Sequence, residues 1–150
     1  MNSLNIIHGA ITALDRDLPV VELAIDRLTL AKCRWRSIAT DGRDFGFDLE
    51  HPLRHGDVFF QTATHQYRIA QMPENVLSVA LTTPAQAASL AWQVGNLHFR
   101  VMIQDGLLLV EDDLALRQLF EREGVAFTPT RAIFQPLAGA AAGAHHHHHH

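Results

Sequence analysis

The spacing of hydrophobic residues divides the chain into two parts with different patterns. In residues 4–70 the apolar residues come in short runs, many of them β-branched or aromatic, which Asp, Gly and Pro separate. Phe45, Phe47 and Leu49 alternate with small or acidic residues, as in a half-buried strand. The pattern predicts a small all-β sandwich or barrel. Its strands are expected at residues 4–7, 20–23, 28–35, 45–49, 58–60 and 67–70.

Beyond Pro73 the pattern changes to alternating strands and helices. Strands are predicted at residues 76–81, 99–104, 107–110 and 125–131, and helices at 84–94 and 114–123. Asp105-Gly106 is a strong signal for a two-residue hairpin between the middle strands. The resulting order, βαββαβ, is the ferredoxin-like arrangement.

The predicted fold class is therefore α+β, with two domains and a tail. Residues 1–72 form an N-terminal β domain that is expected to bind a client or partner. Residues 73–137 are expected to form a ferredoxin-like domain. Residues 138–150 form a flexible Ala/Gly linker and a histidine tail.

The predicted helices have recognisable ends. Thr83 before Pro84 is suited to cap the first helix, and Gly95-Asn96 suits the left-handed positions at its C-terminus. Asp112 or Asp113 can cap the second helix, and Gly124 can end it.

His98 stands at the start of the strand that follows the first helix. Phe99, Val101 and Ile103 share one side of this strand, so His98 should face the other way, together with Met102. In a ferredoxin-like sheet that other face carries no helices, and we expect two copies of the chain to meet there. By spacing alone, a strand-end histidine without a special task remains an alternative.

Composition excludes several classes of protein. The chain has 150 residues, of which 47% are hydrophobic and 19% charged, and its formal net charge is −4. A nucleic-acid binder would need a basic face, and a membrane-surface protein a polybasic segment. No apolar run is long enough to span a bilayer, and no signal peptide is evident. Cys33 is the one cysteine, so no internal disulfide is expected, and a cytoplasmic location is predicted.

Several motifs together resemble one known family. The octet Ala91-Trp92-Gln93-Val94-Gly95-Asn96-Leu97-His98 looks like the Ala-Trp-x-Ile-Gly-Asn-x-His signature of UreE, the urease accessory protein family that handles nickel. The segments 32–36, 41–46 and 53–58 resemble the family's N-terminal landmarks in the same order. Phe134-Gln135-Pro136 resembles its Phe-x-Pro close before a histidine-rich tail. Such a set is far more specific than one short motif.

This resemblance implies a nickel metallochaperone and not an enzyme. It implies that His98 of each subunit of a homodimer holds Ni²⁺, which passes to apo-urease through the GTPase UreG. Imidazole also binds Zn²⁺ and Cu²⁺, so either ion is expected to compete. Relatives place further histidines before the second helix, where this chain has Glu111-Asp112-Asp113. These carboxylates are alternatives as oxygen ligands, although helix capping is the more ordinary role.

The chain ends in six histidines after an Ala/Gly run, which is typical of a purification tag. The family often carries a natural histidine-rich tail here, so His145, His147 and His149 are further candidate ligands if the tail is native. The other histidines, at positions 51, 55 and 65, have the spacing of isolated surface residues. An alternative function needs no metal: the β domain would act as an adaptor that binds a peptide or protein along a sheet edge.

Overall fold

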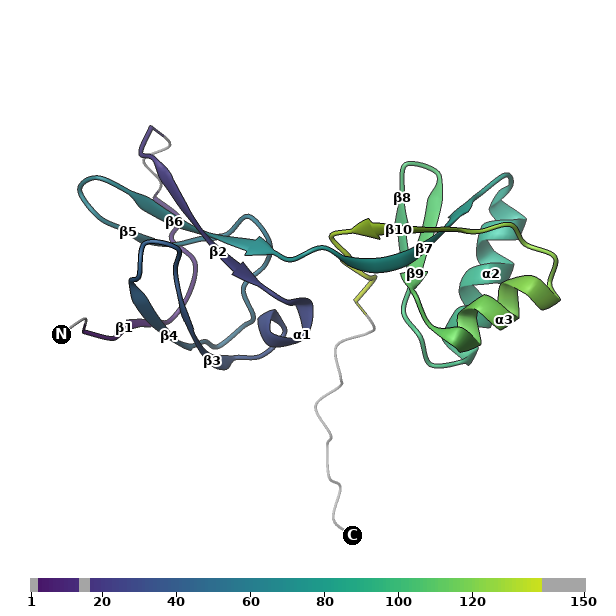
Figure 1. The fold of residues 1–150 in the computed structure, drawn as a ribbon, viewed down its shortest axis with the longest axis horizontal. Coiled ribbons are helices and arrows are strands. Elements are labelled where there is room, and N and C mark those ends of the chain that lie inside the picture. Colours follow the sequence, from purple (N-terminus) through teal and green to yellow (C-terminus); the bar gives the residue numbers. More distant parts are fainter. Residues whose placement is uncertain (1–2, 14–16, 139–150) are drawn as a thin grey trace, which may run out of the picture. The chain divides into compact units, whose positions relative to one another are not determined.

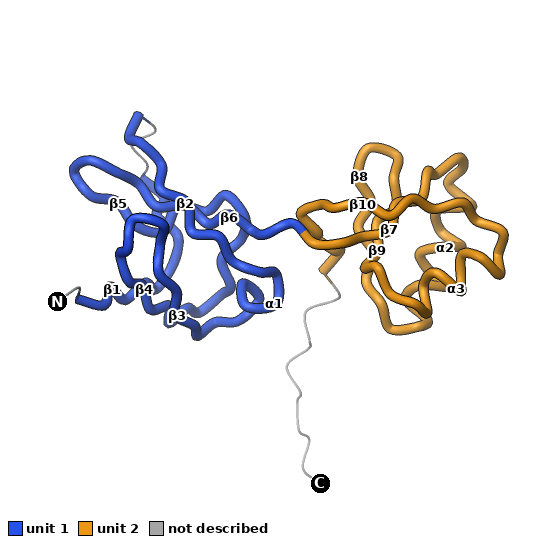
Figure 2. Tube along the Cα trace, viewed as in Figure 1, with its two compact units in different colours: residues 1–73 blue, residues 74–150 orange. Residues whose placement is uncertain are grey.

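A computed structural model describes residues 3–13 and 17–138 of the chain. It divides into two compact units, residues 1–73 and 74–150 (Figure 2). The division lies one residue from the boundary expected from the sequence. The first unit is built almost entirely of strands, and the second mixes strands with two helices (Figure 1). No helix in the described part is long and apolar enough to cross a membrane.

The first unit contains two three-stranded sheets, ordered β1-β4-β3 and β2-β6-β5. Its elements are β1 (Asn5–Ile7), β2 (Val20–Ile25), α1 (Arg27–Leu30), β3 (Arg34–Ile38), β4 (Asp44–Asp48), β5 (Val58–Gln61) and β6 (Gln66–Gln71). Phe45, Phe47, Phe59 and Tyr67 form the aromatic centre of its core. Phe45 and Phe47 on β4 both lie in this core, so the alternation predicted for β4 is confirmed at these two residues.

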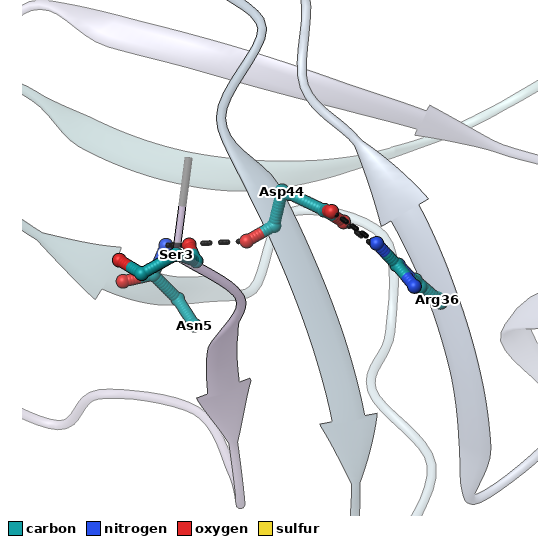
Figure 3. Close-up of polar contacts among 4 residues, drawn as sticks. All are labelled: Ser3, Asn5, Arg36 and Asp44. Carbon is teal, nitrogen blue, oxygen red and sulfur yellow. Dashed lines mark hydrogen bonds and ion pairs between the residues drawn. The ribbon is translucent and has the colours of Figure 1, made fainter. Parts of the chain in front are cut away.

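Polar contacts tie the first of these sheets together. The Asn5 side-chain amide donates to the Asp44 carbonyl at 3.1 Å, which links the parallel strands β1 and β4 (Figure 3). Arg36 on β3 forms an ion pair with the Asp44 carboxylate. This guanidinium lowers the pKa of Asp44 below its ordinary value.

One predicted strand of the first unit is wrong in part. The sequence predicted a strand over residues 28–35, but α1 occupies its first half and β3 begins only at Arg34. The Asp26 carboxylate accepts a hydrogen bond from the Thr29 N–H at 3.0 Å and so caps a single helical turn. A capping side chain of this kind starts a helix where β propensity alone favours a strand.

The second unit is a four-stranded antiparallel sheet with two helices on one face (Figure 1). Its elements are β7 (Glu74–Ala80), α2 (Pro84–Asn96), β8 (Met102–Gln104), β9 (Leu107–Glu111), α3 (Leu114–Arg122) and β10 (Thr128–Ala132). The strand order is β10-β7-β9-β8. Leu77, Val79, Leu108 and Val110 face the helices and are fully buried.

Most sequence-predicted details of this unit are confirmed. Thr83 caps α2 by accepting from the Gln86 N–H, and Asp113 caps α3. Asp105-Gly106 forms the hairpin turn between β8 and β9. The strands predicted at residues 99–104 and 125–131 begin late, at Met102 and Thr128.

The second sheet face carries no helices, as expected, but a later segment of the chain covers its apolar part. After β10 the chain crosses this face, and Phe134 packs there against Val76 and Leu109. Phe134 is fully buried, and Met102 and Ala132 complete this small cluster. The apolar part of the face is therefore covered by the chain itself.

Candidate metal-binding site

Helix α2 ends in a turn whose left-handed residue is a histidine. The Phe99 N–H bonds to the Val94 carbonyl at 3.2 Å, and the His98 N–H to the Gly95 carbonyl at 2.9 Å. These two bonds define a Schellman motif, and Phe99 packs against the apolar cluster that contains Val94. His98 has a φ of 64°. It therefore occupies the position that glycine usually takes.

The predicted positions of this turn are wrong by two to three residues. Gly95 and Asn96 belong to α2, and neither has a positive φ. His98 lies in the turn, ahead of the first residue of β8, Met102. Its side-chain direction thus follows from the turn and not from alternation along a strand.

Helix α3 ends in the same motif with glycine at the equivalent position. The Val125 N–H bonds to the Phe120 carbonyl at 2.8 Å, and the Gly124 N–H to the Glu121 carbonyl at 3.2 Å. Gly124 has a φ of 65°, nearly that of His98. A side chain with a Cβ costs about 1 kcal/mol in this conformation, whereas glycine adopts it freely. The turn itself therefore gives no reason for a histidine.

The His98 imidazole is available to a ligand. The residue is exposed, and none of the residues that the structure describes hydrogen-bonds to its ring. Within residues 3–13 and 17–138, no three His, Cys, Asp or Glu side chains are close enough to hold a metal ion together. Residues His145, His147 and His149 lie outside the described residues.

Histidines of the first unit use ring nitrogens in hydrogen bonds within the chain, and His65 does so with the neighbouring Thr64 hydroxyl at 2.9 Å. The Nδ1 atom of His55 accepts from the Gln71 backbone N–H at 3.0 Å. The neutral ring then carries its proton on Nε2, so it has no free lone pair for a metal. The Nδ1 atom of His8 is 3.0 Å from the Asp48 carbonyl and must donate to it. His55 is thus a structural residue and not a candidate ligand.

The topology places His98 and the acidic segment 111–113 at the same end of the second unit. Strands β7 and β8 are both antiparallel to β9, so α2 must run back between them. Strands β9 and β10 are both antiparallel to β7, so α3 runs opposite to α2. The C-terminus of α2 therefore lies beside the N-terminus of α3 (Figure 1).

The aspartates of this segment already have partners. Asp112 accepts from Arg117 Nε at 2.7 Å and from its Nη2 at 2.9 Å. These hydrogen bonds lower the pKa of Asp112 below its ordinary value. Asp113 accepts from the Ala115 N–H at 2.8 Å as the helix cap. Their role is therefore helix stabilisation, which is the more ordinary of the two interpretations of the segment.

The structure adds an apolar surface beside His98 that the sequence patterns did not single out. Trp92 on α2 has 69% of its surface exposed, and Leu97 in the same turn is also exposed. Leu114 at the start of α3 is exposed at this end of the unit as well. The sequence does carry a signal for this surface, because α2, from Pro84 to Asn96, contains no charged residue. Exposed apolar side chains on an uncharged helix indicate a contact surface.

Comparison with known proteins gives a consistent result. Residues 74–150 match the family described as UreE urease accessory protein, C-terminal domain. The chain is 39% identical to the urease accessory protein UreE of Burkholderia ambifaria over 126 residues, which cover 81% of this chain and 60% of that protein. It therefore spans about three fifths of the length of that relative.

Other relatives are matched over more of their own length. The UreE protein of Pseudomonas putida is 37% identical over 112 residues, covering 73% of this chain and 70% of that protein. That of Azotobacter vinelandii is 34% identical over 122 residues, covering 79% and 74%. The name describes an accessory protein of urease and not an enzyme, in agreement with the sequence prediction. The chain belongs to the UreE family of urease accessory proteins.

Proposed function

We propose that this chain is a nickel metallochaperone, which binds Ni²⁺ through His98 from each of two copies and delivers it for assembly of the urease active site. The observation that carries this proposal is the state of His98. Its backbone is held in a conformation that favours glycine, and its imidazole is exposed and has no hydrogen-bond partner among the residues that the structure describes. Strain at a non-glycine residue supports a functional role for its side chain.

Two copies are needed because one imidazole cannot hold a transition metal firmly. Such ions take four to six ligands, and two-fold symmetry brings each residue near the axis to the site twice. Water would complete the shell, and an exposed site of this kind releases its ion readily, as a carrier must. Zn²⁺ and Cu²⁺ are expected to compete, since imidazole binds both.

The two copies are proposed to meet on the outward face of α2. The apolar part of the open sheet face is already covered by Phe134, so it offers little to a second copy. Helix α2 instead presents the exposed Trp92 between the small residues Ala88 and Gly95, close in sequence to His98. Small residues allow close approach of two helices, and an aromatic side chain adds contact area.

The fold of the second unit and the cellular context belong to the same proposal. The order β10-β7-β9-β8 with helices on one face supports a ferredoxin-like assignment. The proposed partners are a second copy of the chain, the GTPase UreG and apo-urease, in the cytoplasm. If the tail is native, His145, His147 and His149 would add ligands to the metal shell.

Calorimetric titration of tag-free protein with Ni²⁺ tests this function. We expect about one Ni²⁺ per two chains in the wild type, and loss of that binding in His98→Ala. His55→Ala is the matched control, because it removes an exposed histidine whose Nδ1 is already engaged. Equal nickel affinity in wild type and His98→Ala would contradict the proposal.

A second candidate, the adaptor function of the first unit, is supported by the free edge of β3. At the ends of the antiparallel pair with β4, the Leu49 N–H donates to the Cys33 carbonyl and the Ala39 N–H donates to the Arg43 carbonyl, both at 2.9 Å. The backbone groups of the even-numbered residues 34, 36 and 38 therefore point away from β4, where an extended segment could pair with them. An adaptor would keep its client when His98 is replaced and lose it in Ile38→Pro, which removes one donor at this edge.

A further inference from the structure

The chain after β10 does more than cover an apolar cluster. Residues Phe134–Leu137, here called the C-terminal strap, cross the helix-free face of the sheet from β10 toward β8. Phe134 anchors the strap in the core. The Leu137 N–H then donates to the Val101 carbonyl at 2.7 Å, and the Gln135 N–H to the Met102 sulfur at 3.3 Å.

Both of these hydrogen bonds reach the segment between His98 and β8. Strand β8 has three residues, Met102–Gln104, and pairs only with β9 among the described strands. Val101 precedes the first of these pairs, so its backbone is not held by the ladder. The strap supplies the partner that the sheet lacks at this point.

The segment that carries His98 is thus fixed from two sides. On its N-terminal side, the Schellman bond from Phe99 to Val94 fixes it to α2. On its C-terminal side, the strap fixes Val101 and Met102. His98 lies inside the turn that the bond from Phe99 to Val94 closes, and Arg100 lies between Phe99 and Val101. Both residues are exposed.

We propose that the C-terminal strap is a positioning element for His98, and that the Leu137 N–H is its decisive contact. This inference rests on the proposed role of His98 as a nickel ligand. Ligands that are held in place before binding lose less conformational freedom when the ion arrives. In a two-fold site each copy contributes one such segment, so the smaller loss of conformational freedom applies to both ligands.

The role of Leu137 resides in its backbone. Its side chain is 60% exposed, so truncating that side chain removes little buried surface. Leu137→Pro removes the N–H donor, and Pro136 before it already favours the extended backbone that a second proline needs. Leu137→Ala keeps the donor and is the matched control.

Three measurements on full-length, tag-free protein test the inference: Ni²⁺ titration, hydrogen exchange at the Phe99 amide without metal, and urea unfolding. In Leu137→Pro we expect nickel affinity about tenfold weaker and faster exchange at this amide. Leu137→Ala should stay within about twofold of the wild type. Both variants should unfold at nearly the same urea concentration as the wild type, which a general loss of folding would not allow.

Wild-type affinity and wild-type exchange in folded Leu137→Pro would overturn the inference. If that variant does not fold, chains ending at Pro136 and at Leu137 provide the same comparison, because only the longer one retains the donor. Equal nickel binding by wild type and His98→Ala would instead reject the proposed function. Hydrogen exchange in metal-free protein would still decide whether the strap holds the segment.

Discussion

At the scale of the residue, His98 and Gly124 form a comparison within one chain. Both occupy the left-handed position of a Schellman turn, with φ values of 64° and 65°. Only position 124 carries glycine, the residue that this backbone conformation favours. The difference in unfolding free energy between histidine and glycine at this position measures the stability that the protein loses by having an imidazole at the end of α2.

We therefore expect His98→Gly to raise the free energy of unfolding by up to about 1 kcal/mol while nickel binding is lost. Gly124→Ala should lower it by about 1 kcal/mol, since no neighbour lies within 4 Å of the added Cβ and backbone strain is the remaining effect. Urea unfolding of tag-free protein measures both. A His98→Gly variant clearly less stable than the wild type would show that the imidazole has a structural role in the turn.

At the scale of the element, α3 depends on the charge of an aspartate. The hydrogen bonds from the Arg117 guanidinium lower the pKa of Asp112 below its ordinary value, so the native state favours the ionised carboxylate. A lowered pKa stabilises the folded state above the unfolded pKa, and this contribution disappears as the pH falls through the folded value. The midpoint temperatures of thermal unfolding of Asp112→Asn and wild type should therefore approach each other as the pH falls below about 4.

The matched control for this pH prediction is Glu121→Gln, which removes an exposed carboxylate from the same helix. At neutral pH, the difference in thermal unfolding midpoint between Glu121→Gln and wild type should be smaller than that between Asp112→Asn and wild type. A difference between Asp112→Asn and wild type that stays constant from pH 7 to pH 3 would contradict the assigned ion pair.

The sequence revealed most of the second unit because its signals are local. The apolar spacing of α2 and α3, the Asp105-Gly106 turn and the Gly124 stop each depend on a few neighbouring residues. The sequence did not predict the left-handed backbone of His98. Gly95-Asn96 is typical of a helix end, but α2 continues through both residues. The strap escaped because Phe134 meets Val76 and Leu109 only after the chain has folded, and no local pattern encodes that contact.

At the scale of the whole molecule, the two units have separate hydrophobic cores, and each is described by itself. The proposed contact between copies concerns the second unit alone. Light scattering of tag-free protein should give a dimer, and Trp92→Glu should shift it toward the monomer, because a charge would be buried on the uncharged face of α2.

Leu28→Glu is the control for this experiment. Leu28 lies in the first unit and, like Trp92, has 69% of its surface exposed. It should leave the assembly unchanged. If both variants dimerise like the wild type, the contact between copies lies elsewhere, and paired His98 side chains at α2 would lose their structural basis.

The turn at the end of α2 also has a consequence for sequence design. A procedure that optimises stability alone would write glycine at position 98, as the chain already has at position 124, and would thereby remove the proposed metal ligand. Random substitution under selection for folding alone would drift in the same direction. A redesigned version of this protein must therefore hold position 98 fixed and recover the lost stability at other positions.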